Sequence, residues 1–387
     1  MYLIIVVLLL YCILKYDVYN YTPYRKSWFV FILIILILVS GLSYRLGGDG
    51  IGYMREFSQY NLLAGLNYNE LSNYSGRQPG WVLLVKLCRY IIDDYSFFKL
   101  VHATIVNTLF LITIRRYSRF VFTGILFYFI LIYFDYNFQV LRQSLAVSVF
   151  LGAIPYFEEN KWIKYYIICM ISALFHESAL ITFIIPVIKL FGVSRGILPL
   201  YFVISMSALL GGGQLVQSIM PTFLQTSIGG KAYHYTSELN TDGIAGVSVN
   251  LLMNLIIPYI YLYISFLKKN SKCLGVIPYF VIIYGIIYCF GLQLPIMYRF
   301  NQYFQIFIFL YFIEIFSSII RWINRKYKVN YAMAFIFISL LFLTYRGRMY
   351  FLPYGDTIYP SYVQYYPYSS VLFKKTNPTR EALFRYM

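Results

Sequence analysis

A histidine and a glutamate stand inside an apolar run, where a plain lipid-facing helix would need neither. The run is IICMISALFHESALITFII, residues 167–185, and it contains His176, Glu177 and Ser178. A histidine titrates near neutral pH, so His176 is a candidate general base, general acid or phosphate ligand. The alternative role is structural, as a hydrogen bond across two helices.

Arginines that flank the apolar segments form a second set of chemically capable residues. The planar guanidinium binds phosphate bidentately, so several arginines at one membrane face indicate an anionic ligand, and for any single one the alternative is contact with lipid headgroups. Arg142 opens an apolar segment with Gln143 and Ser144 beside it. A charged residue in a membrane helix is costly, so it indicates a functional role. The other arginines of this set are Arg45, Arg55, Arg77 and Arg299.

The stretch YRLGGDGIGYMREF, residues 44–57, combines glycines with charged side chains. Glycines let the backbone approach a ligand closely and adopt positive φ. Arg45, Asp49 and Tyr53 stand four residues apart, which would align them on a helix, but the glycines favour a compact loop. Asp49 is the second candidate for a general base. A plain turn is the alternative interpretation of this stretch.

The elements that must position these residues are membrane helices. Sixty per cent of the chain is hydrophobic and 12 per cent is charged, with a mean hydropathy of +0.65, whereas a soluble domain is about a quarter charged. Apolar blocks recur along the chain, each close to the roughly 20 residues that cross a bilayer. The opening MYLIIVVLLLYCILKY lacks a basic region and a cleavage site, which favours a retained first helix. We predict an all-α polytopic membrane protein.

Loops rich in lysine and arginine should face the cytoplasm. The basic clusters fit one alternating path if the N-terminus starts outside and about twelve helices cross. The segment near residues 79–92, which carries Lys86 and Arg89, must then be interfacial or re-entrant. The resulting prediction is a single membrane domain over residues 1–345, with outer loops at about 44–96 and 212–246, and a periplasmic tail over residues 346–387.

The predicted membrane topology also explains the histidine-containing run. Residues 162–190 would be about 43 Å long as one helix, which is long for one crossing. Two short helices meeting near His176 would keep the basic loops at both ends inside. A break at membrane depth is tolerated only where protein or a water-filled cavity surrounds it. We therefore predict a cavity near His176 that opens to the outer side.

Several classes of function are disfavoured by the composition. The five cysteines are scattered without a CxxC pair, and the three histidines are not spaced as metal ligands, so no metal or cofactor is expected. The net charge of +17 is spread over loops on both faces, which argues against a nucleic-acid partner. We find no Gly-rich strand-turn-helix motif for a nucleotide-sugar.

Taken together, these segments resemble the EpsG family of bacterial polysaccharide-polymerisation proteins, which are functionally like the Wzy O-antigen polymerases. The resemblance rests on RLGGDGIGYMREF, on QPGWVLLVKL, and above all on LRQSLAVSVFLGAIPYF followed by EENKWIKYYIICMISALFHESALI. The later element RFNQYFQIF, residues 299–307, also resembles the family.

The resemblance implies a GT-C-like membrane glycosyltransferase in the bacterial inner membrane. It would join undecaprenyl-diphosphate-linked oligosaccharide repeats at the periplasmic face, in O-antigen or exopolysaccharide synthesis. Its expected partners are the lipid-linked oligosaccharide, the lipid bilayer and a chain-length regulator. The predicted catalytic residues are His176, Asp49 and Arg142, and the predicted substrate-binding residues are Arg45, Arg77, Arg299, Tyr53 and Gln143.

Two other classes of protein stay open as alternatives. A flippase or transporter would also have a cationic cavity, but is expected to show paired repeats with broken helices in both halves. Residues 162–190 have no such counterpart. A membrane O-acyltransferase would also pair an embedded histidine with a polar partner, and would need a route for an acyl carrier.

Overall fold

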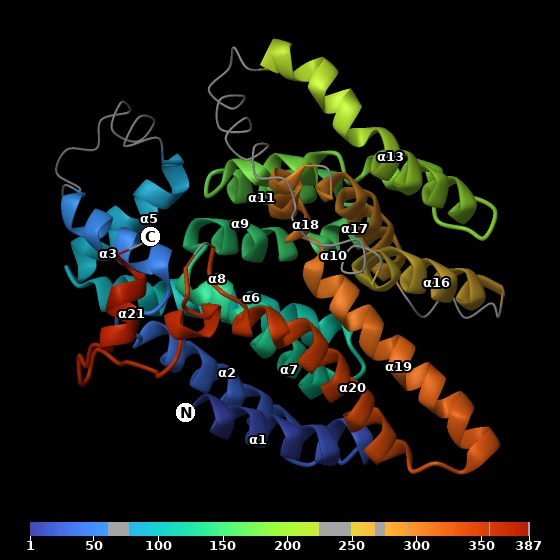
Figure 1. Ribbon diagram of the computed structural model, residues 1–387, viewed down its shortest axis with the longest axis horizontal. Helices are drawn as coiled ribbons and strands as arrows, with labels where there is room; N and C mark the ends of the chain where they lie inside the picture. The colour runs from blue at the N-terminus through green and yellow to red at the C-terminus, as the bar shows by residue number, and fades with distance from the viewer. Residues whose placement is uncertain (61–76, 224–248, 268–274, 293, 356, 386–387) are drawn as a thin grey trace. The chain divides into compact units, whose positions relative to one another are not determined.

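The computed structural model describes residues 1–60, 77–223, 249–267, 275–292, 294–355 and 357–385 of the chain. Every regular element within these ranges is a helix (Figure 1). Extended backbone pairs there only as two isolated bridges, Ser43 with Ser370 and Pro353 with Pro360. The all-α prediction is therefore confirmed for this part of the chain.

The helices pack into two compact units, which we describe separately. The first comprises Met1–Ala153, Tyr166–Glu177 and Phe316–Met387, and the second comprises Ile154–Tyr165 and Ser178–Ile315. The first unit contains α1 (Tyr2–Cys12), the π-helix η1 (Ile13–Val18), α2 (Arg25–Gly41), α3 (Gly48–Gln59), α5 (Pro79–Ile91), α6 (Tyr95–Tyr117), α7 (Val121–Leu131), α8 (Tyr133–Phe138), α9 (Leu141–Leu151), α20 (Tyr331–Gly347), η8 (Arg348–Phe351), η9 (Ser361–Gln364) and α21 (Pro378–Leu383).

The second unit contains shorter helices and three longer apolar ones. These are α10 (Ile154–Glu158), most of the 3₁₀ helix η4 (Glu177–Phe183), α12 (Val187–Phe191), α13 (Leu198–Phe223), η5 (Leu252–Ile256), α16 (Ile257–Leu267), α17 (Ile277–Gly291), η7 (Pro295–Met297) and α18 (Tyr298–Asn301). Two helices, α11 (Trp162–Ala173) and α19 (Gln305–Tyr327), contribute residues to both units.

The longer helices are those of a multi-pass membrane protein. Four described helices are long and apolar enough to cross a bilayer, and four apolar helices are shorter. The total of about twelve crossings and the GT-C-like architecture stay predictions. The loops predicted at 44–96 and 212–246 lie partly outside the described residues. The helix α5 has 13 residues, about 20 Å in length, and is shorter than the roughly 30 Å of hydrocarbon that a crossing requires.

The central helix of the first unit is α6. It packs along α2 and also contacts α5, α7 and α9. Its buried face mixes apolar residues such as Val106 and Phe110 with Asn107. The Asn107 amide donates to Asn137 Oδ1 (2.9 Å) and to Ser40 Oγ (3.3 Å), and so joins α6 to α8 and α2. Such hydrogen bonds join helices where no water is available to replace them.

The chain breaks where the sequence predicts it. The helix α11 ends at Ala173, and residues 174–176 leave the helical path before η4 begins. The predicted break near His176 is therefore confirmed, although a 3₁₀ helix follows it before the next α-helix. The carbonyl oxygen of Leu174 is left without a helical partner and accepts from the backbone N–H of Gly80 (2.8 Å), which fixes the break against the start of α5.

Candidate functional site: an arginine-lined pocket

The compact loop expected over residues 44–57 is mostly a helix, so this prediction was wrong. Residues 44–47 form a turn, and α3 follows. The glycines serve close packing: a Cβ on Gly47, whose φ is +75°, would overlap the carbonyl oxygen of Phe138. A Cβ on Gly50 would lie 2.7 Å from the same oxygen. The start of α3 thus lies directly against the end of α8.

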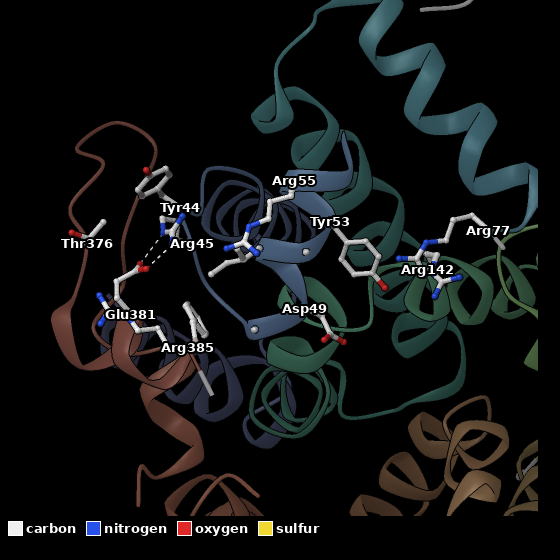
Figure 2. A pocket seen from close by; sticks show the side chains of 14 residues that line it. Tyr44, Arg45, Asp49, Tyr53, Arg55, Arg77, Arg142, Thr376, Glu381 and Arg385 are labelled. Carbon is white, nitrogen blue, oxygen red and sulfur yellow. Dashed lines mark hydrogen bonds and ion pairs between the residues drawn. The ribbon is translucent and has the colours of Figure 1, made fainter. Parts of the chain in front are cut away.

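One wall of a pocket of about 750 Å³ is formed by α3 (Figure 2). Asp49 and Tyr53, four residues apart on this helix, both line it, as their helical spacing permits. Arg45, four residues before Asp49, lines the pocket from the preceding turn. The five arginines that line the pocket are Arg45, Arg55, Arg77, Arg142 and Arg385, and the acidic lining residues are Asp49 and Glu381.

Arg142 reaches the pocket because the backbone breaks between α8 and α9. Two buried side chains of α6 hold this break. Lys99 Nζ donates to the carbonyl oxygen of Asn137, and His102 Nε2 donates to the carbonyl oxygen of Leu141 (3.0 Å). The Asn137 carbonyl lies in the last turn of α8, where helical donors are missing, and the two contacts together fix the first turn of α9, on which Arg142 lies.

The guanidinium of Arg142 is only partly satisfied. Its Nη1 donates to Gln78 Oε1 (2.9 Å), just before α5. Its Nε is buried and has no hydrogen-bond partner among the described residues. A buried donor without an acceptor costs about 1–3 kcal/mol.

Arg77 forms an ion pair with a carboxylate at the end of the pocket where Arg142 lies. It forms a bidentate pair with Glu56, with Nη2–Oε2 at 2.7 Å and Nε–Oε1 at 3.0 Å. Its guanidinium also lies over the Tyr53 ring, 5.9 Å from the ring centroid. This pair joins α3 to the segment before α5, which carries Gln78, and so places the partner of Arg142.

The C-terminal segment forms the opposite end of the pocket. Glu381 on α21 accepts two hydrogen bonds from Arg45, at 2.8 Å from Nε and 2.5 Å from Nη2. These bonds lower the pKa of Glu381 and raise the pKa of Arg45. Arg385, one turn further along the chain, lines the same end.

The helix α21 is held in place by a buried arginine. Arg380 is 1% exposed and donates to the Val363 carbonyl oxygen (3.1 Å), to Ser369 Oγ (3.1 Å) and to the Pro367 carbonyl oxygen. The backbone of the same segment pairs with residues 42–44 before α3, for example from Tyr44 N to the Ser369 carbonyl oxygen (2.9 Å). The C-terminal segment is therefore part of the pocket wall.

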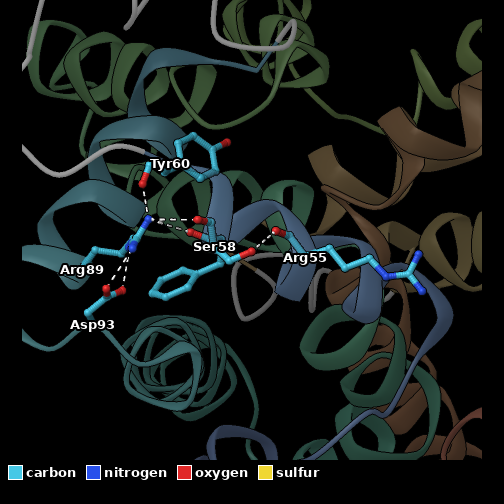
Figure 3. Close-up of polar contacts among 6 residues, drawn as sticks. Arg55, Ser58, Tyr60, Arg89 and Asp93 are labelled. Atoms are coloured by element: carbon cyan, nitrogen blue, oxygen red, sulfur yellow. Dashed lines mark hydrogen bonds and ion pairs between the residues drawn. The ribbon is translucent and has the colours of Figure 1, made fainter.

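The far end of α3 is fixed by Arg89 of α5 (Figure 3). Arg89 Nη1 donates to the carbonyl oxygens of Phe57 (3.2 Å), Ser58 (3.4 Å) and Tyr60, while its Nε pairs with Asp93 (2.6 Å). A cation at the carboxyl end of a helix is favourable, because unpaired carbonyl groups collect there. Arg55 takes part in this cluster only through its carbonyl oxygen, and its exposed side chain extends away from it.

The structure brings together some of the predicted site residues and leaves others apart. His176 is 5% exposed and belongs to the first unit, but it does not line the pocket. Gln143 is buried on α9, and Arg299 lies on α18 of the second unit. Those that do line the pocket are Arg45, Asp49, Tyr53, Arg77 and Arg142.

Other residues of the site are not among the sequence predictions. Gln78 orients Arg142, and Glu381 and Arg385 close the pocket from the C-terminus. The only local signal for α21 was Asn377 followed by a proline, the pattern of a capped helix start, and Asn377 does accept from the backbone N–H of Arg380 (3.0 Å). Among the described residues, no three His, Cys, Asp or Glu side chains are grouped to hold a metal.

The fold and the pocket define a multi-pass membrane protein with an arginine-lined pocket. More specifically, the chain belongs to the EpsG family: the family model matches residues 26–384, nearly the whole chain. This family consists of bacterial membrane proteins of the Wzy-like polymerase type, and the expected membership is confirmed. No curated protein and no solved structure matches the chain.

Proposed function

We propose that this protein is a glycosyltransferase that polymerises undecaprenyl-diphosphate-linked oligosaccharide repeats at the periplasmic face of the inner membrane. The arginine-lined pocket is its active site in this proposal. The observation that carries it is the gathering of five arginines around Asp49 in a member of a polymerase-type family. Like charges repel, so such a cluster is stable chiefly where an anion or buried partners offset the repulsion.

The proposed reaction transfers the growing chain to the next repeat. A hydroxyl oxygen of the incoming lipid-linked repeat attacks the anomeric carbon at which the growing chain is attached to its lipid diphosphate. The bond between that carbon and the diphosphate oxygen breaks, and the lipid diphosphate leaves with the electron pair. The hydroxyl proton passes to a base of the protein. Fixed guanidinium groups stabilise the charge that develops on the leaving diphosphate.

Residues of the pocket fit these steps. Arg142 binds the leaving diphosphate, because its buried Nε lacks an acceptor among the described residues. Asp49 lines the pocket together with these arginines and is the proposed base, and Tyr53 contributes an aromatic wall for sugar binding. Arg45 and Arg77 hold the walls through their carboxylate partners and add positive potential. His176, the other base that the sequence predicts, is the alternative to Asp49 in this proposal and is tested against it.

The destination of the polysaccharide and the partner proteins belong to the same proposal. O-antigen and exopolysaccharide are the two products considered, and a chain-length regulator is the proposed protein partner. The side of the membrane is testable on intact cells. A Thr376→Cys variant at the pocket rim should react with a membrane-impermeant maleimide, and labelling only after lysis would place the pocket on the cytoplasmic side.

The decisive experiment is deletion of the gene, with analysis of the surface polysaccharide. A polymerase deletion reduces the ladder to a single repeat unit, and wild-type protein restores it, while an Asp49→Asn variant present at normal level does not. Complete loss of surface sugar with intermediates retained in the cytoplasm would indicate a flippase instead. Full-length chains that lack acyl groups would indicate an O-acyltransferase.

A further inference from the structure

We propose that the pocket binds two anionic groups at once, at separate subsites on either side of Asp49. This inference rests on the proposed function, because a polymerase must hold two lipid diphosphates: that of the growing chain and that of the incoming repeat. The hydroxyl that attacks lies at the other end of the incoming repeat from its diphosphate. The second diphosphate therefore needs a binding place of its own.

The first subsite lies where α9 meets the start of α5. Arg142 and Arg77 both line the pocket here, and Gln78, which accepts from Arg142, immediately follows Arg77. The charge of Arg77 is offset by its ion pair with Glu56, so Arg142 is the arginine whose charge remains available to a ligand. The buried Nε of Arg142 gives this end a donor that awaits an acceptor.

The second subsite lies where α3 meets α21. Arg45 is matched by Glu381 here, in the same way as Arg77 is matched by Glu56 at the other end. Arg55 and Arg385 line the pocket with exposed side chains, and neither forms an ion pair in the described ranges, while Arg385 also feels the negative charge of Glu381. Two guanidinium groups therefore remain for a ligand at this end.

Asp49 and Tyr53 separate the two ends. Figure 2 shows both side chains between Arg77 and Arg142 on one side and Arg45, Arg55 and Arg385 on the other. One diphosphate that bridged the ends would lie against the Asp49 carboxylate and be repelled by it. Two separate anions, each with its own uncommitted arginines, avoid this repulsion and leave Asp49 between them to receive a proton.

The burial of the arginines indicates which of the two diphosphates binds at each subsite. Charge develops on the diphosphate of the growing chain as it leaves, and a buried donor stabilises such charge more strongly than an exposed one. Arg142 is the arginine with a buried, unpartnered Nε, so its end takes the leaving diphosphate. Arg55 and Arg385 are exposed and hold the diphosphate of the incoming repeat, which does not change in the reaction.

The test counts bound ligands on the purified full-length protein in detergent, with farnesyl diphosphate as the probe. Native mass spectrometry should show two equivalents on the wild-type protein. Arg142→Gln should lose one and keep the other, and the Arg55→Gln/Arg385→Gln double variant should do the reverse, each with the affected Kd raised about tenfold or more. Arg325→Gln, on an exposed arginine at the end of α19, is the matched control and should keep both.

A single equivalent on the wild-type protein would overturn the proposal, as would loss of both equivalents in an Arg142→Gln variant with unchanged melting temperature. These results are separable from failure of the proposed function. Two independent equivalents together with an unchanged polysaccharide ladder after gene deletion would refute the polymerase and leave the subsites standing. One equivalent with a collapsed ladder would refute the two subsites alone.

Discussion

The arginine-lined pocket and the break at His176 are two polar features of the same compact unit, built in opposite ways. The pocket collects its charges from segments between residues 44 and 385 and leaves Arg55 and Arg385 exposed. The break uses one continuous stretch, in which His176 is buried and its backbone N–H donates to the Ser172 carbonyl oxygen (3.4 Å). A ligand reaches the pocket directly, whereas it would reach His176 only if the packing around it opened.

The comparison shows when an ionisable residue in an apolar sequence indicates a binding site and when it does not. One buried histidine indicates polar surroundings, and a structural hydrogen bond satisfies this requirement as well as a substrate does. Several arginines that converge in space repel one another, so their convergence indicates a bound anion or committed carboxylates. In this pocket two arginines form ion pairs with carboxylates and three do not, among the residues that the structure describes.

The largest effect is expected at Arg142. Arg142→Lys should fail almost as badly as Arg142→Ala, with turnover per molecule lowered about a hundredfold, because an ammonium group cannot replace the bidentate fork or the buried Nε donor. The measurement is the chain-length distribution of the polysaccharide at matched protein level. A normal distribution with lysine would reassign Arg142 to contact with lipid headgroups.

The next comparison sets Asp49 directly against His176. Asp49→Asn should abolish polymerisation at normal abundance, because the pocket loses its base. His176→Ala should mainly lower abundance, through a loss of about 1 kcal/mol of stability, and retain activity per molecule. Activity normalised to membrane protein separates the two. Complete inactivity of His176→Ala at full abundance would establish the catalytic role predicted from the sequence and extend the site to the break.

The glycines at and just before the start of α3 offer a test of how the pocket wall is built. Gly47→Ala and Gly50→Ala should each destabilise the protein by about 1–3 kcal/mol, because the added Cβ meets the backbone of Phe138. Gly52→Ala is the matched control, because nothing lies within 4 Å of its added Cβ. Melting temperatures in detergent measure the difference, and equal stability of the three variants would contradict the close packing.

A smaller effect is expected for the pair between Arg45 and Glu381. Glu381→Gln should cost at most about 1 kcal/mol of stability, because the pair is partly exposed and α21 is also held by Arg380. Activity should fall a few-fold as Arg45 loses its fixed orientation. The exchanged pair Arg45→Glu/Glu381→Arg should recover the stability. Recovery of neither stability nor activity would indicate that Arg45 itself binds the substrate.

The smallest effect is a pH dependence of stability that Glu381 contributes. Its pKa is lowered by the hydrogen bonds from Arg45, so the folded state holds the carboxylate ionised more strongly than the unfolded state does. The stabilisation is complete above the usual glutamate pKa of about 4.3 and is lost as the pH falls through the lower folded value. Melting curves between about pH 3 and 6 should show this loss in the wild-type protein and a smaller one in Glu381→Gln.

The helical membrane class, the family and the break before His176 could all be predicted from the amino-acid sequence. These depend on apolar content and on short-range patterns, and helix formation in a bilayer is a local consequence of both. It also identified Arg45, Asp49, Tyr53, Arg77 and Arg142, which come together in one pocket. Their charges or spacing could be recognised without knowing which side chains lie opposite them.

The tertiary structure alone decided what these residues face. Gly47 and Gly50 lie on either side of Asp49 against the backbone of Phe138, far along the chain, which leaves no room for side chains at these two positions. Glu381 pairs with Arg45 across 336 positions of sequence, and no local pattern encodes such a contact. Electrostatic partners and free space depend on residues brought together by packing, and for that reason only the structure separates the committed arginines from those left for a ligand.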